Sequence, residues 1–208
     1  MSLQPPKSTL ILLDLGLVVV DVQLSTGRAT WRELCGGNSG DFDRLFFDSG
    51  IKYRMDIGEL SGQSAIDEIA KLVDYKVIPE VIEASWNAVL NARPAMSAAI
   101  QALSRTYRCD VISNTDPIHA AWIQKNCGIM GAITNWTFSF DSGHMKPQKA
   151  LFEIALEAAQ IPATQVLLLD DRRDNVATAQ ALGMDTIVVE NEVQALAELQ
   201  SRGFDIGL

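Results

Sequence analysis

The stretch TLILLDLG, residues 9–16, decides how this chain folds. Thr9 to Leu13 are all apolar or β-branched, which is typical of a strand buried on both faces of a parallel sheet. Asp14 follows directly, and Gly16 allows the backbone to turn sharply beside it. Open α/β sheets bind their ligands in the crevice outside the carboxyl ends of the strands. We therefore expect Asp14 to lie where this fold binds ligands.

Three more stretches, further along the chain, place polar residues after expected strands or between expected strands and helices. They are VISNT at 111–115, GHMKP at 143–147 and VLLLDDRRDN at 166–175. From residue 92 onward, strand and helix patterns alternate. Strands are expected at 108–112, 137–140, 165–169 and 186–189, and helices at 94–103, 117–125, 147–158, 175–182 and 192–199. Strict alternation predicts the α/β class, with a Rossmann-like, doubly wound parallel sheet covered by helices on both sides.

Residues 21–91 have a different pattern. Turn signals and apolar spacing predict helices at 30–34, 41–47, 61–73 and 79–90, with a glycine-rich loop at 36–40 and no strand. Ser61 is a plausible N-cap of the third helix. The sequence therefore predicts a catalytic core formed by residues 8–20 and 92–208. A small helical cap, residues 21–91, is inserted after the first strand.

The composition restricts the partners of this chain. Its 208 residues include 17 Lys and Arg against 26 Asp and Glu, a net charge of -9. That acidity argues against a nucleic-acid partner, because phosphates need basic side chains. An anionic small substrate would need a local positive centre, most simply a metal ion. Three cysteines without metal or disulfide spacing, and no leader or membrane pattern, predict a cytoplasmic protein without a membrane partner. A homodimer is left open.

The polar residues at the expected strand ends share one edge of the sheet. They are Asp14, Ser113, Lys146 and the pair Asp170-Asp171. Three carboxylates without a cation would repel one another and raise each other's pKa. Oxygen ligands without His or Cys favour Mg²⁺, held together with water and a substrate phosphate.

Such a site suits phosphoryl transfer, in which positioning and charge neutralisation do most of the catalysis. Asp14 would attack phosphorus and form an aspartyl-phosphate that water later hydrolyses. Ser113 and the backbone N–H of Asn114 would hold a phosphoryl oxygen. Lys146 would neutralise charge on the phosphate and on Asp14. The expected substrate is a small phosphorylated molecule.

These motifs, in this order and over nearly the whole chain, resemble the haloacid dehalogenase superfamily. The resemblance is to the phosphatase branch whose helical cap follows the first motif. It implies that Asp14 is the nucleophile and that Ser113 and Lys146 bind phosphate. It also implies a metal site at Asp14, Gly16, Asp170 and Asp171. The Gly16 carbonyl and Asp171 would be direct ligands, Asp170 would bind through water, and Asn175 would support the metal loop.

One position departs from that branch. Most of its phosphatases carry a second Asp two residues after the nucleophile, as general acid, and here that residue is Gly16. Asp-Leu-Gly is similar to a subgroup that includes sugar-phosphate phosphatases, so a sugar phosphate is one candidate substrate. Two other functions stay open. One is a catalytically weak, regulatory protein that binds metal and phosphate. The other is a 2-haloacid dehalogenase, which needs no metal and is disfavoured by Asp170-Asp171.

Some of these residues also have structural interpretations. Ser113 could cap the helix that starts near Pro117. Asp170-Asp171 could form a solvated turn. We expect His119 and His144 to be bystanders, and Asp21 to belong to a turn at the hinge of the cap.

Overall fold

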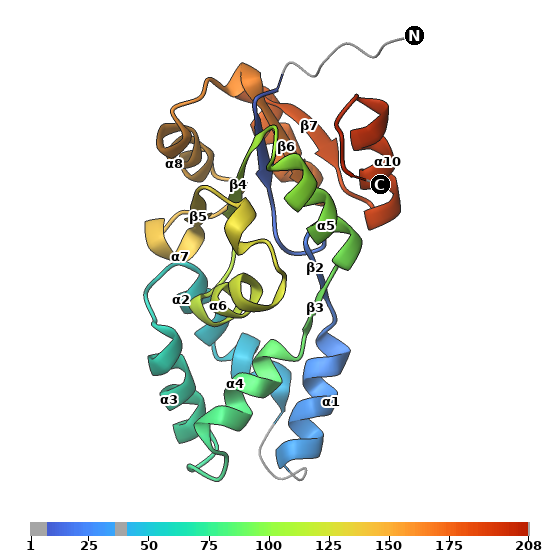
Figure 1. Ribbon diagram of the computed structural model, residues 1–208. Coiled ribbons are helices and arrows are strands. Elements are labelled where there is room, and N and C mark those ends of the chain that lie inside the picture. Colours follow the sequence, from blue (N-terminus) through green and yellow to red (C-terminus); the bar gives the residue numbers. More distant parts are fainter. Residues whose placement is uncertain (1–7, 36–40, 208) are drawn as a thin grey trace.

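The main sheet is parallel and contains five strands within the residues that the structure, a computed structural model, describes, 8–35 and 41–207 (Figure 1). The strand order is β5 (Trp136–Phe138), β4 (Arg108–Ser113), β1 (Leu10–Leu13), β6 (Val166–Asp170) and β7 (Asp185–Val188). Each neighbouring pair runs in the same direction. The predicted α/β fold with a parallel sheet is therefore confirmed.

Strand β1 lies at the centre of the sheet and is buried on both faces. Ile11 and Leu13 belong to the same buried cluster as residues of α5 (Pro94–Leu103) and α10 (Glu192–Ser201). Leu10 and Leu12 belong to a second cluster, with residues of α8 (Lys149–Ala159) and α9 (Arg173–Ala181). Alternate side chains of a strand point to opposite faces, so helices cover the sheet on both sides.

Two predicted elements of the core end or begin elsewhere. Phe140 was expected in a strand, but β5 ends at Phe138 because its partner β4 ends opposite, at Ser113. Phe140 lies in a short helix, α7 (Ser139–Ser142). The next helix, α8, begins at Lys149 rather than at Pro147. The side chain of Asn114 bonds both backbone polar groups of Lys146, and this holds the preceding segment as a loop.

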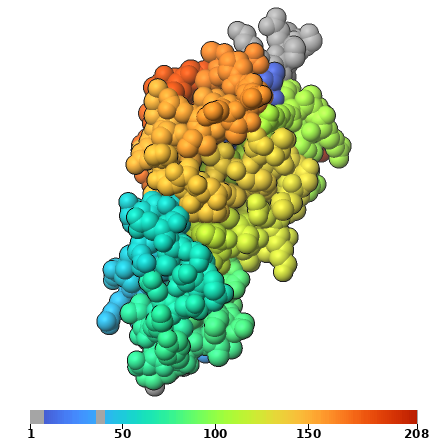
Figure 2. Space-filling model, turned by 90° about the vertical axis from the view of Figure 1, so that its left-hand side faces the viewer, coloured from blue at the N-terminus to red at the C-terminus, as the bar shows by residue number. Residues whose placement is uncertain are grey.

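The region 21–91 is mainly helical. It contains α1 (Leu24–Cys35), a π-helical turn (Arg44–Asp48), α2 (Ile51–Asp56), α3 (Gly62–Leu72) and α4 (Pro79–Asn87). Ser61 caps α3 as expected, since its Oγ accepts from the N–H of Ser64 at 3.1 Å. The prediction missed α2 and started α1 six residues late, and the loop expected at 36–40 lies outside the described residues. Helices α1, α3 and α4 lie at one end of the molecule, away from the sheet (Figures 1 and 2).

The expectation of no strand in this region is wrong. Strands β2 (Val20–Val22) and β3 (Leu90–Ala92) pair antiparallel, outside the main sheet, where the chain enters and leaves the helical region. Three residues are too few to show the alternation that marks a strand in a sequence. The boundaries predicted at 20/21 and 91/92 fall inside these strands.

Arg93 fastens this strand pair. Its Nε donates to Asp21 Oδ1 at 2.8 Å, its Nη1 donates to the carbonyl of Leu17, and its backbone N–H donates to the carbonyl of Val19 at 3.0 Å. The carboxylate of Asp21 is thus engaged in holding the strand pair.

Among the described residues, no helix combines the length and apolar character needed to cross a membrane.

Candidate active site

Three neighbouring strands bring their polar ends together. Asp14 follows β1, Ser113 ends β4, and Asp170 ends β6. Because β4, β1 and β6 are adjacent and parallel, their carboxyl ends meet at one edge of the sheet. Asp14, Asp170 and Asp171 each place a carboxylate oxygen within 4.8 Å of the others. We call these three residues and Lys146 the acidic cluster.

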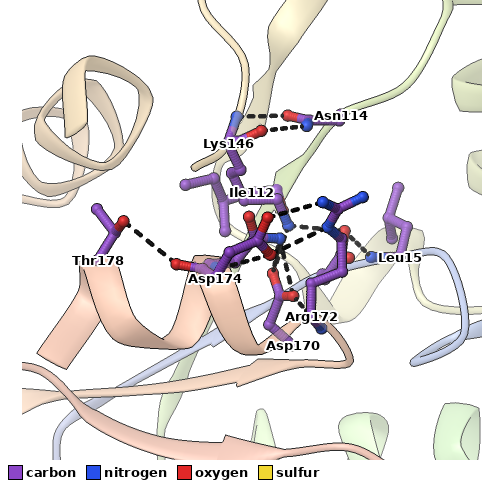
Figure 3. Close-up of polar contacts among 10 residues, drawn as sticks. Leu15, Ile112, Asn114, Lys146, Asp170, Arg172, Asp174 and Thr178 are labelled. Carbon is purple, nitrogen blue, oxygen red and sulfur yellow. Dashed lines mark hydrogen bonds and ion pairs between the residues drawn. The ribbon is translucent and has the colours of Figure 1, made fainter. Parts of the chain in front are cut away.

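Lys146 contacts two of the three carboxylates of the acidic cluster, and Figure 3 shows it between Asn114 and Asp170. Its Nζ lies 3.0 Å from Asp14 Oδ1 and 2.7 Å from Asp170 Oδ2, and it donates to the carbonyl of Ile112 at 3.0 Å. The residue is buried. Burial alone would lower the pKa of Lys146, but the two carboxylates outweigh it and raise the pKa above its usual value. The side chain of Lys146 is therefore a charged ammonium that contacts Asp14, Asp170 and the carbonyl of Ile112.

The side chain of Asn114 positions Lys146. Its Nδ2 donates to the carbonyl of Lys146 at 2.8 Å, and its Oδ1 accepts from the N–H of Lys146 at 2.7 Å. Sequence reasoning placed Asn114 at the phosphate through its backbone N–H. The structure shows a contact that this reasoning did not include, because the amide of Asn114 fixes the loop that carries Lys146.

Asp170 is fully buried and surrounded by donors. Its oxygens accept from Asn175 Nδ2 at 2.9 and 3.0 Å, from the N–H of Arg172 at 2.9 Å and from Lys146 at 2.7 Å. The other amide atom, Asn175 Oδ1, is buried and has no hydrogen-bond partner in the described part of the chain. It is an unpaired acceptor on a side chain that binds Asp170, suited to the water of a hydrated cation.

The acidic cluster has more negative than positive charge. Burial, reinforced by Asp170 and opposed by Lys146, raises the pKa of Asp14 to about 6. Burial and Asp170 also raise the pKa of Asp171. Three carboxylates share one ammonium, and all the candidate ligands are hard oxygen atoms. This donor set fits Mg²⁺, which would be held by Asp14, Asp170 and Asp171 together with the Gly16 carbonyl.

Ser113 is buried at the end of β4 and lines a cavity on the side of the acidic cluster that faces the helical region. It does not cap the following helix, α6 (Pro117–Asn126). The cap is Asp116, whose Oδ1 accepts from the N–H groups of Ile118 at 3.0 Å and His119 at 2.9 Å. The structural interpretation of Ser113 as a helix cap is therefore wrong.

Sequence reasoning missed a second buried group of charges. We call Lys52, Asp56, Asp116 and His119 the Asp116 cluster. Lys52 and Asp56 come from α2 and form an ion pair, and Lys52 Nζ also lies 3.7 Å from Asp116 Oδ2. Trp86 Nε1 of α4 donates to the same oxygen at 3.2 Å. The cluster therefore joins two helices of the region 21–91 to α6.

His119 is engaged at both ring nitrogens. Nδ1 lies 3.1 Å from Asp116 Oδ2, and Nε2 lies 3.1 Å from the carbonyl oxygen of Trp86. Burial would raise the pKa of Asp116, but His119 and Lys52 outweigh it and hold that pKa well below the usual range. The sequence does indicate a role for Asp116 as a helix N-cap, because Asp before Pro is typical of a helix start. Nothing in the sequence indicates the contacts of Lys52 and Trp86. His144, the other histidine, is exposed.

Comparisons with known proteins agree with this architecture. The chain matches a HAD family enzyme of Bacteroides thetaiotaomicron, crystallised with magnesium and inorganic phosphate. The TM-score is 0.80 with 22% identity, over 91% of this chain and 98% of that one. It also matches the L-2-haloacid dehalogenase of Xanthobacter autotrophicus, crystallised with covalently bound chloropropionic acid. There the TM-score is 0.61 with 16% identity, over 95% of this chain and 84% of the other. Likeness at these identities shows a shared fold.

A curated relative is bifunctional epoxide hydrolase 2 of Mus musculus, 26% identical over 135 residues. The match takes in 63% of this chain but only 24% of the mouse protein. The family model of haloacid dehalogenase-like hydrolases matches residues 21–183. That span includes Ser113, Lys146, Asp170 and Asp171 and begins after Asp14. Its extent, with the sheet and the arrangement of the motifs, shows that the chain belongs to the haloacid dehalogenase-like hydrolases.

Proposed function

We propose that this hydrolase is a Mg²⁺-dependent phosphatase that acts on a small phosphomonoester through an aspartyl-phosphate on Asp14. The observation that carries the proposal is the acidic cluster, in which one buried ammonium lies against Asp14 and Asp170 while three carboxylates leave an excess of negative charge. Such a cluster suits a cation and a phosphoryl group bound together.

The contacts of Asp14 support different tasks for its two oxygens. Oδ1 accepts from the N–H of Leu15 at 2.7 Å and lies 3.0 Å from Lys146 Nζ, so the other oxygen, Oδ2, is the proposed nucleophile. A bond forms between Oδ2 and phosphorus as the bond from phosphorus to the leaving oxygen breaks. Water then attacks the phosphorus, which releases inorganic phosphate and restores the carboxylate.

The other residues hold the phosphoryl group during both steps. The hydroxyl of Ser113 and the backbone N–H of Asn114 donate to a phosphoryl oxygen, and Lys146 offsets charge on the phosphoryl group and on Asp14. A bound Mg²⁺ supplies further neutralisation of the phosphoryl oxygens. Asn175 and the N–H of Arg172 keep Asp170 oriented as an anion.

The 2-haloacid dehalogenase reaction is the main rival, because a dehalogenase shares the fold. Its Asp attacks carbon and needs no metal. The uncompensated charge of Asp14, Asp170 and Asp171 therefore supports phosphoryl transfer over attack on carbon. A regulatory protein that binds phosphate without turnover would have the same cluster, so only kinetics separates it from an enzyme.

A panel of phosphomonoesters and 2-haloacids, assayed with Mg²⁺ and with a chelator, tests the proposal. We expect release of phosphate that stops on chelation, and a phosphorylated Asp14 in rapidly quenched samples. If halide is released at the same rate with and without the chelator, the protein is a dehalogenase and the phosphatase proposal fails. Phosphate binding without turnover of any ester would favour the regulatory protein.

A further inference from the structure

A cavity of about 180 Å³ lies beside the acidic cluster, between the core and the helical region. It is lined at one end by Leu15 and Gly16, which follow Asp14, and by Ser113 and Asn114. A phosphoryl group held at these residues would direct its ester oxygen into the cavity. The inference below rests on the proposed function, since it takes the phosphoryl group to lie at Asp14.

The walls of this cavity are mostly apolar. They include the side chains of Val22, Leu24, Phe47, Trp86, Leu90 and Ile123. Trp86 stacks between Phe46 and His119, with ring centroids 4.5 Å apart on each side and interplanar angles of 5° and 6°. This stack fixes the wall of the cavity that Trp86 and His119 form.

The polar residues that line the cavity are largely engaged already. They are Lys52, Ser113, Asn114, Thr115 and His119. The amide of Asn114 has both of its atoms bonded to Lys146, and His119 is bonded at both ring nitrogens. The ammonium of Lys52 is paired with Asp56. A hydroxyl that enters the cavity would thus give up its bonds to water for few partners in the described part of the chain.

We propose that the cavity binds the leaving group, and that the enzyme prefers phosphomonoesters of compact, apolar alcohols or phenols over those of polyhydroxylated sugars. The volume is comparable to cavities that hold a single benzene-sized molecule, about 150 Å³. This substrate class differs from the sugar phosphate that the first motif suggests. The difference arises from the cavity walls, which the motif does not include.

Cyclohexyl phosphate and inositol monophosphate form a matched pair of probes. Both present a six-membered carbon ring to the cavity, but inositol has a hydroxyl on each of the remaining carbons. Those hydroxyls make inositol the more acidic leaving group. A preference for the cyclohexyl ester therefore cannot arise from leaving-group acidity. Binding is measured by calorimetry on Asp14→Asn in the presence of Mg²⁺, where turnover does not interfere.

We expect cyclohexyl phosphate to bind at least about tenfold more tightly than inositol monophosphate. Val22→Thr in the Asp14→Asn background should reduce this ratio at least about threefold, because it adds a hydroxyl partner to the wall with little change of volume. Val193→Thr makes the same chemical change at an exposed site on α10 and should leave the ratio unaltered.

Equal binding of the two esters, tighter binding of the inositol ester, or binding of neither would overturn the assignment of the cavity. So would a ratio that Val22→Thr and Val193→Thr change alike. Turnover by the unaltered enzyme tests the proposed function separately. If no phosphomonoester is hydrolysed while Asp14→Asn still discriminates between the esters, the phosphatase proposal fails and the preference of the cavity stands.

Discussion

The acidic cluster and the Asp116 cluster are both buried and ionic, but they differ in how their charges are balanced. In the acidic cluster, three carboxylates share Lys146, and the pKa of Asp14 rises to about 6. In the Asp116 cluster, one fully buried carboxylate meets backbone N–H groups, a tryptophan N–H, a histidine and a lysine, and its pKa falls. Three carboxylates around one ammonium indicate a place for a cation, whereas Asp116, whose oxygens already accept from several donors, indicates a structural joint. Burial also raises the pKa of Asp56 in the Asp116 cluster, so the contrast lies in the balance of charges and not in a raised pKa alone.

Asp14→Asn should have the largest effect on activity. The amide cannot attack phosphorus, so we expect phosphate release to fall by at least about 10⁴-fold. The fold should survive, because the amide removes a buried charge whose pKa shows that ionisation is unfavourable there. Steady-state assays and a thermal melt on the same sample measure both effects. Full activity in a correctly folded variant would refute Asp14 as the nucleophile.

Asp116→Asn should instead reduce stability. The charge of Asp116 stabilises the fold at pH values above the usual carboxyl pKa near 4, since its own pKa is depressed in the folded state. We expect a loss of about 3 kcal/mol at pH 7, or roughly 6–12 °C in Tm. The loss should shrink as the pH falls below about 4, because the carboxyl of the unaltered protein then gains a proton in the unfolded chain while it stays ionised in the folded one.

Denaturant unfolding over a range of pH measures this effect. Asp185→Asn is the matched control, because Asp185 is an exposed carboxylate that pairs with Arg202 and should contribute less than about 1 kcal/mol. If the two substitutions cost the same at pH 7, the Asp116 cluster is not the joint that its contacts indicate.

The acidic cluster and the Asp116 cluster also differ in how far the sequence could predict them. Asp14, Ser113 and Asp170 each follow or end a short apolar run, and the rule that parallel strands share one end places them together. Lys146 was found through the order of the motifs. The contacts of Lys52 and Trp86 could not be predicted in this way. They depend on how α2 and α4 pack against α6, and apolar spacing within one helix does not specify its neighbour.

Mg²⁺ should stabilise the protein through the acidic cluster. A cation that binds only the folded state at about 100 times its Kd adds about 2.7 kcal/mol. Asp171→Asn should remove most of this gain, because it deletes one of the candidate ligands and lowers the negative charge of the site. Asp174→Asn removes the same charge from a nearby residue that pairs with Arg172 outside the cluster, and should retain the gain. Calorimetric melts with and without Mg²⁺ measure the difference, and equal gains in both variants would contradict the assignment of Asp171.

The smallest expected effect concerns Gly16, which occupies the position of the missing general acid. The structure favours a test by Gly16→Asp, since a Cβ at this residue would meet only Val22 Cγ2, at 3.8 Å, and its φ is not left-handed. The positive φ of this turn is at Leu17 instead. A new carboxyl could therefore enter without backbone strain. It would face an apolar wall of the cavity beside Val22.

An acid at residue 16 would protonate the departing oxygen and then activate the water that attacks the aspartyl-phosphate, roles that typically contribute about 10² to 10⁴-fold each. Because the surrounding wall is apolar and Asp14 is close in sequence, we expect only about a tenfold gain for alkyl esters, which is below this range. Nitrophenyl phosphate needs no protonation of its leaving group, so only the hydrolysis of the phosphoenzyme should accelerate. Rapid-quench measurement should then find phosphorylated Asp14 accumulating with nitrophenyl phosphate in the unaltered enzyme and less of it in Gly16→Asp. Rates that do not depend on the leaving group, with no phosphoenzyme in either protein, would contradict this prediction. Another residue would then supply the proton, or product release would limit turnover.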